Sequence, residues 1–274
     1  MKITKTFLSV FFLTFLIGYV SVLPIKKVSA PKGISIIIPK ENSDLPIETK
    51  VEEEILEENN DWQEEDETKF KIKLIETGEG FHGDEIQAKS GETWLGLFKE
   101  KNKYNLRSVK IKVRRSFDVI VDELEEKTGK DVIVEGKKQP LFLVKNAEML
   151  REGEIKTVFY APSFDEAIRL QNGFVAEYKL NDKKYNLRVE GGTNSSTLIL
   201  ESENNRQVLY FVGAMGDATW NLYWVGDLDK DGKLDLYADI PVFYNFSQKR
   251  LFLSSQAENG RLVKQVALFH TIGC

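Results

Sequence analysis

The chain has almost none of the residues on which a zinc enzyme or a disulfide-bonded domain depends. Its 274 residues include one cysteine, Cys274, and two histidines, His82 and His270. A single cysteine cannot form an internal disulfide, so the fold must rely on its core. The terminal thiol either pairs between chains or has no role. Neither histidine has a partner at the spacing of a zinc site, so we do not expect a catalytic zinc centre.

The sequence also lacks the surplus of positive charge that nucleic-acid binding needs. Its formal net charge is -5, and residues 41–67 alone hold thirteen acidic residues and one lysine. The chain therefore has no surplus of basic residues to neutralise many phosphates, and nucleic acid is not an expected partner. The chain contains no GxSxG elbow, no P-loop and no dinucleotide fingerprint. We predict no catalytic residue and no cofactor-binding residue, and whether the protein is an enzyme stays open.

Only one long apolar run is present, over residues 7–23. It follows the basic start MKITK and precedes the small residues of 28–30, which is the arrangement of a secretory signal. Two lysines and Pro31 are unusual beside a cleavage site, so residues 1–30 are either a cleaved signal peptide or an uncleaved anchor. The protein is expected to be secreted or periplasmic, and to contact a membrane only in the uncleaved case.

The segment after the apolar run is predicted to be an acidic, disordered tether over residues 31–67. Its like charges repel one another, and it has few apolar residues to bury. A docking peptide for a partner is the alternative interpretation of this segment.

Beyond residue 67 the apolar residues recur at every second position, which predicts half-buried β-strands. KFKIKLIE (69–76) shows the pattern, with apolar side chains on one face and lysines on the other. Similar runs continue to the C-terminus, including FDVIVDEL (117–124) and WNLYWV (220–225). In the last run Trp220, Leu222 and Trp224 are expected on one face, where they either pack in the core or offer an aromatic surface to a ligand.

Helical patterns are rare in this part of the chain. Only residues 146–152 and 161–171 look helical, and both segments are short. We predict a mostly β protein with one or two antiparallel β-sandwich or barrel-like domains and few short helices. The predicted domains or halves are residues 68–161 and 162–274.

The stretch GDLDKDGKLDLYAD (226–239) gathers aspartates around one glycine. Aspartates stand at positions 1, 3, 5 and 9 of a loop that begins at Asp227, and Gly232 at position 6 permits a sharp turn. Calcium takes about six to eight oxygen ligands, which alternate side chains of one loop can supply. The predicted ligands are Asp227, Asp229, Asp231, the carbonyl of Lys233, and Asp235. An acidic turn without an ion, and an ion that bridges a bound partner, are the alternatives.

The loop resembles the DxDxDGxxD calcium loops of FG-GAP and VCBS-type β repeats, in which strands flank the ion. An EF-hand would have a glutamate at position 12, where this chain has Ala238. The resemblance implies calcium as the ion and Asp239 or a water as the remaining ligand. A single copy argues against a propeller. The C-terminal part of the chain contains WVGDLDKDGKLDL (224–236), FYNFSQKRLFLSSQAENGRLVKQVALF (243–269) and a final GC. With these segments it resembles a bacterial family of secreted proteins with no assigned activity.

These features together predict an exported, non-catalytic, calcium-binding β protein. It would be a binding or envelope-associated module whose partner is an extracellular or periplasmic glycan or protein. The alternative is a calcium-stabilised hydrolase that acts on carbohydrate, since a glycosidase needs only two suitably placed carboxylates. Acidic residues are plentiful, and nothing in the sequence singles out a pair.

Overall fold

The computed structural model describes residues 35–36, 66–136, 138–192, 195–213 and 218–273. Within these ranges the chain is mostly antiparallel β-strand, and the two helices are single 3-10 turns. The elements in chain order are β1 (Ser35–Ile36), η1 (Glu67–Lys69), β2 (Lys73–Ile75), β3 (Gly78–Phe81), β4 (Thr93–Glu100), β5 (Lys103–Ser116), β6 (Gly129–Val134), β7 (Leu143–Lys145), β8 (Gly153–Tyr160), η2 (Phe164–Glu166), β9 (Ile168–Leu170), β10 (Val175–Leu180), β11 (Lys183–Glu190), β12 (Ser196–Ser202), β13 (Asn205–Val212), β14 (Trp220–Asp227), β15 (Asp235–Asp239), β16 (Phe246–Leu253) and β17 (Lys264–Ile272).

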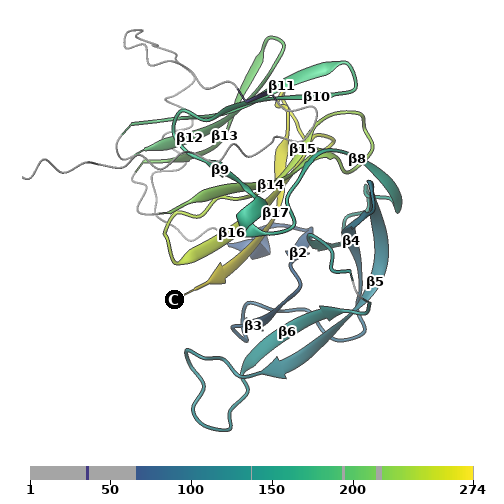
Figure 1. Cartoon of the computed structure of the whole chain (residues 1–274), viewed down its shortest axis with the longest axis vertical. Coiled ribbons are helices and arrows are strands. Elements are labelled where there is room, and N and C mark those ends of the chain that lie inside the picture. The colour runs from purple at the N-terminus through teal and green to yellow at the C-terminus, as the bar shows by residue number, and fades with distance from the viewer. Residues whose placement is uncertain (1–34, 37–65, 137, 193–194, 214–217, 274) are drawn as a thin grey trace, which may run out of the picture. The chain divides into compact units, whose positions relative to one another are not determined.

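The strands form a small sheet and a large one (Figure 1). The small sheet has the order β1-β10-β11-β12-β13, and β10 to β13 pair antiparallel in chain order. The main path of the large sheet is β17-β16-β15-β14-β8-β5-β4-β7-β2. Because β2 also contacts β17, the large sheet curls until its two edge strands lie side by side. It therefore has a barrel-like form.

Two apolar cores lie on opposite faces of the C-terminal strands. The first core is enclosed by the curled sheet and includes Phe98, Phe142 and Phe269. The second core lies between the small sheet and β14 to β16, and includes Leu187 and Leu236. Every residue of β14 and of β15 is buried. These two strands therefore form the wall that the two cores share, and the turn that joins them carries the predicted metal ligands.

The predicted fold class is confirmed, because the described residues are mostly antiparallel strand with sandwich-like and barrel-like packing. Strands from both sides of the boundary expected at Pro162 belong to the same large sheet, since β8 pairs with β14. Two residues of the expected tether, Ser35 and Ile36, pair with β10. The rest of that segment up to residue 65, and the expected signal at residues 1–30, lie outside the described residues.

Three local predictions were wrong. Residues 117–124 are not a strand but part of the loop between β5 and β6. Residues 161–171 form the single turn η2 and then β9, because Ile168–Leu170 pairs with β14. Residues 146–152 form a turn whose Ala147 and Leu150 are buried in the first core. In the last two segments tertiary pairing and burial outweighed a local helical preference.

The described residues contain no helix that is long and apolar enough to cross a membrane.

Candidate metal centre

The acidic loop joins β14 to β15, with Asp227 at the end of one strand and Asp235 at the start of the next. Gly226 and Asp235 are paired across the hairpin, so the loop closes immediately beyond the ladder. Gly226 has a steric role, because a Cβ there would lie 2.3 Å from the carbonyl oxygen of Lys156 on β8. Only glycine lets β14 approach β8 this closely.

Two leucines within the loop fix its base. Leu228 packs in the first core and Leu234 in the second, and both are fully buried. The loop is thus anchored on both faces of the shared wall. Gly232 at the tip has a φ of +82°, the left-handed region that glycine adopts without strain.

Backbone amides of the tip point toward the carboxylates. The Gly232 amide donates to Asp227 Oδ2 at 3.1 Å, and the Asp231 amide donates to Asp229 Oδ1 at 3.2 Å. The Lys233 amide donates to Asp231 Oδ1 at 2.8 Å. Through these short-range hydrogen bonds the backbone of the tip holds the side chains of alternate aspartates in place.

A second segment, just after β16, completes the surroundings of the loop. The amide and hydroxyl of Ser254 donate to Asp235 Oδ1 at 2.7 and 2.9 Å, and the Leu228 amide donates to Asp235 Oδ2 at 2.6 Å. The Ser254 hydroxyl also lies 2.9 Å from Asp231 Oδ1. Sequence reasoning missed Ser254, since only its polarity after an apolar strand could have marked it.

The structure brings three of the four predicted aspartate ligands together. One carboxylate oxygen from each of Asp227, Asp229 and Asp235 lies within 4.8 Å of the others. Asp231 stands beside this trio and pairs instead with the Lys233 ammonium at 3.5 Å. Nothing in the geometry tests the Lys233 carbonyl, so its role as a ligand stays a prediction.

Because the carboxylates are buried, bringing their negative charges together destabilises the fold unless a cation is bound. Asp227 is 5 % exposed, and its Oδ1 atom has no hydrogen-bond partner among the described residues. Asp235 is fully buried. Burial raises the pKa of both carboxyls, and the negative charge of Asp229 adds to the effect. An unpartnered buried carboxylate oxygen is rare in proteins and needs an explanation. A cation held by the three carboxylates supplies one.

Asp239 does not belong to this site, contrary to one expectation. It lies at the far end of β15 from Asp235, roughly 13 Å away along an extended strand. Its carboxylate accepts from the Gln248 amide at 2.7 Å and from the Ser247 hydroxyl at 3.0 Å. A water is thus the remaining candidate for completing an ion's coordination.

The tryptophans ahead of the loop are core residues. Trp220 and Trp224 are fully buried, so they offer no aromatic surface to a ligand. The expectation that both lie on one face was wrong, because the pairing of β14 with β15 shifts between Leu222 and Trp224. This irregularity moves Trp224 into the first core with Tyr223, while Trp220 and Leu222 pack in the second.

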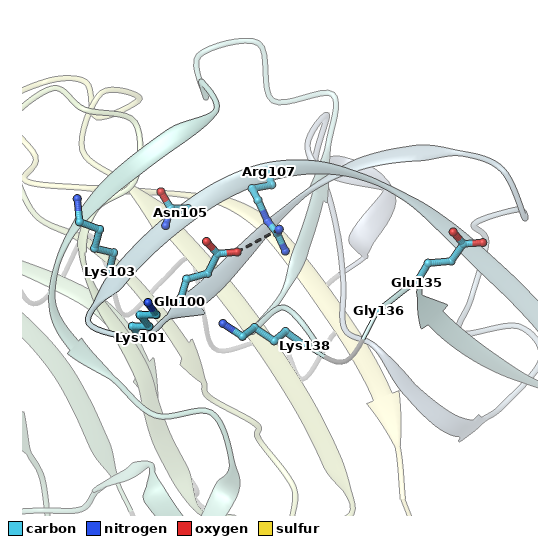
Figure 2. Close-up of a pocket in the computed structure, with 8 residues that line it drawn as sticks. All are labelled: Glu100, Lys101, Lys103, Asn105, Arg107, Glu135, Gly136 and Lys138. Atoms are coloured by element: carbon cyan, nitrogen blue, oxygen red, sulfur yellow. Dashed lines mark ion pairs between the residues drawn. The ribbon is translucent and has the colours of Figure 1, made fainter.

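A separate hollow of about 570 Å³ lies on β4, β5 and the segment after β6 (Figure 2). Figure 2 shows Lys103, Asn105 and Arg107 following one another along β5, with the Arg107 guanidinium paired to Glu100 at 3.0 Å. Cations and carboxylates are mixed here, and none of the lining residues comes from the acidic loop. Nothing in this hollow indicates a particular ligand.

Comparison with protein-family models, with characterised proteins and with solved structures found no match to the chain.

Proposed function

We propose that this chain is an exported β protein whose loop at residues 227–235 binds one calcium ion. The observation that carries the proposal is the buried, unpartnered Oδ1 atom of Asp227, which lies in a group of three converging carboxylates. The ion would neutralise charge that is otherwise buried at a cost. It would also give the orphan oxygen a partner.

The geometry of the trio suits calcium. Two oxygens bound to one calcium are at most about 5 Å apart, because each lies about 2.3–2.6 Å from the ion. The three carboxylate oxygens meet this limit. The donor set contains only oxygen, which favours a hard cation over zinc or copper. In this proposal Asp231 and the carbonyl of Lys233 also serve as ligands, directly or through water.

The loop lies between two strands, which supports its likeness to the FG-GAP and VCBS-type loops rather than to an EF-hand. The same placement favours a structural role. The ion would join the end of β14 to the start of β15 and, through Ser254, to the end of β16. Asp235 is fully buried and both of its oxygens accept hydrogen bonds, so the site offers little room for a substrate.

We further propose that the protein works without catalysis, as a binding or envelope-associated module outside the cytoplasm. Two acidic residues of the small sheet are held in ion pairs. Glu177 pairs with Lys184, and Glu201 lies 3.5 Å from both Arg188 and Arg206. Among the residues that the structure describes, no feature favours the hydrolase over the binding module. The glycan or protein ligand would be sought by binding screens with and without calcium.

Isothermal titration calorimetry tests the metal site directly. Calcium should bind with a stoichiometry of one and a Kd on the order of 10⁻⁴ to 10⁻³ M, the range of extracellular modules. Magnesium should bind much more weakly, because it prefers a tighter octahedron and retains its waters. Asp229→Ala should abolish binding, whereas Asp165→Ala, at an exposed aspartate in η2, should bind like the parent. Absence of heat at millimolar calcium would refute the site.

A further inference from the structure

The loop at residues 117–128, between β5 and β6, exposes its apolar side chains to solvent. It projects beyond β6 at the lower end of the molecule in Figure 1. Exposed fractions run from 48 % at Phe117 to 95 % at Leu124. The exposed apolar residues are Phe117, Val119, Ile120, Val121 and Leu124. Clusters of this kind on soluble proteins mark interaction sites.

The loop holds this arrangement because two of its carboxylates, those of Asp118 and Asp122, bind its own backbone. Asp118 is buried, and its carboxylate lies 2.6 Å from His82 Nδ1 and accepts from the Ile120 amide at 3.1 Å. Asp122 accepts from the amides of Asp118 and Thr128 at 2.8 and 2.9 Å. In most surface loops acidic side chains face water and apolar ones are buried. Here the aspartates accept hydrogen bonds from backbone amides, and the apolar side chains face water. Such a loop is preorganised, so little entropy is lost when it binds.

Acidic residues surround the apolar tip. Glu123, Glu125 and Glu126 are exposed and form no ion pair with any described residue. An anionic lipid surface would be repelled by this rim. The surface that fits the tip has an apolar floor and basic edges.

The same hairpin carries such a surface. A hollow of about 370 Å³ lies beside the loop end of the β5–β6 ladder, and it is lined by the half-buried Val113 and Ala88 and by several cations. Among these, Lys89 and Arg115 are exposed and form no ion pair with any described residue. The hollow and the tip are thus complementary in charge and polarity. They lie too near each other on one hairpin for a tip to enter its own hollow.

We propose that the occupant of this hollow is the tip of a second copy of the chain. In a two-fold dimer each hairpin would insert its tip (residues 117–126) into the other's basic hollow. Both contacts form at once, because a two-fold axis relates them. The glutamates of each tip would then form ion pairs with Lys89 and Arg115 of the other copy. The side chains of Leu124 and Val121 would be buried in the interface.

Sedimentation velocity in calcium-containing buffer tests the proposal. The parent should show a monomer–dimer equilibrium that weakens with salt, because exposed ion pairs are screened. Leu124→Asp should raise the dimer Kd by about tenfold or more, as expected for a loss of about 1.4 kcal/mol. Circular dichroism should show that the variant keeps its fold. Lys101→Glu with Lys138→Glu, in the hollow of Figure 2, should leave the Kd unchanged.

Charge reversal gives a sharper test. A tip variant (Glu123→Lys with Glu125→Lys) and a hollow variant (Lys89→Glu with Arg115→Glu) should each stay monomeric alone. Mixed together they should form a heterodimer, because both contacts become complementary again. A monomeric parent at every concentration, or a mixture that does not associate, would overturn the proposal. So would a parent that floats with phosphatidylcholine vesicles as a monomer, which would assign the tip to a membrane.

Discussion

Replacement of Asp227 by asparagine should change the stability of the protein in opposite directions with and without calcium. Asparagine has nearly the same size as aspartate, and its side-chain oxygen can still accept the bond from the Gly232 amide. The substitution removes the charge and places an amide nitrogen where the unpartnered oxygen stood. In the described structure that charge is buried, one of its oxygens has no partner, and burial raises the pKa of the carboxyl.

The two effects can be given magnitudes. In a chelator, loss of a buried and incompletely paired charge should raise the free energy of unfolding by about 1 kcal/mol. At roughly 100-fold excess of calcium over Kd, the parent should gain about 2.7 kcal/mol. For a folded body of this size about 1 kcal/mol corresponds to about 2–4 °C in Tm. The parent should therefore gain about 5–10 °C in calcium, and Asp227→Asn almost nothing.

Differential scanning calorimetry in chelator and in about 10–100 mM calcium, a roughly 100-fold excess over the expected Kd, would measure this reversal of order. Asp165→Asn, at an exposed aspartate outside the loop, is the matched control and should follow the parent in both buffers. A variant that responds to calcium as strongly as the parent would show that Asp227 is not a ligand. A variant less stable than the parent in chelator would show that its charge is already compensated within the protein.

Three further predictions concern other parts of the chain. Burial raises the pKa of Glu67 to about 7, above its usual 4.5, so the folded state holds a proton that the unfolded state has lost. Its contribution to stability should be full below about pH 4.5 and fall by about 2 kcal/mol as the pH rises from about 4.5 through 7, and Glu67→Gln should remove this slope in pH-dependent urea titrations. Lys249→Met should cost about 3–5 kcal/mol in urea unfolding, because it leaves Asp239 and Glu76, 3.5 and 3.7 Å away, without their buried cation; a cost under about 1 kcal/mol would contradict this. Mass spectrometry of the protein purified from its native cells should show a chain without residues 1–30, whereas an intact N-terminus in the membrane fraction would indicate an anchor.

Alternation in the sequence predicted the strands well where one face of the strand is buried. It predicted them less well where both faces are buried, or where apolar side chains face solvent. Alternation in β11 survives in the structure, with Tyr185, Leu187 and Val189 buried in the second core. Residues 117–124 show similar alternation but form a loop, because Asp118 and Asp122 bind the backbone instead of facing solvent. Periodicity cannot distinguish these cases, since it records polarity and not the direction in which a side chain points.

The part of the candidate site that comes from the loop at residues 227–235 could be predicted from the sequence. The spacing of Asp227, Asp229 and Asp235 was enough to predict that they converge. The contribution of Ser254 was not, because 19 residues separate it from Asp235 and only the pairing of β15 with β16 brings them together. The position of Asp239 was also misjudged. Its distance from the loop follows from the length of β15, which the sequence does not delimit.

The wall formed by β14 and β15 has a consequence for how the protein unfolds. Each strand sends side chains into both cores, with Leu236 in one and Tyr237 in the other. Neither core can lose this wall and remain closed, so the curled sheet and the small sheet should not melt as independent units. A chain that looks divisible in sequence should therefore show one cooperative transition, in which the calorimetric and van't Hoff enthalpies agree. Slow hydrogen exchange should extend across the wall into both sheets, with similar opening free energies on its two sides.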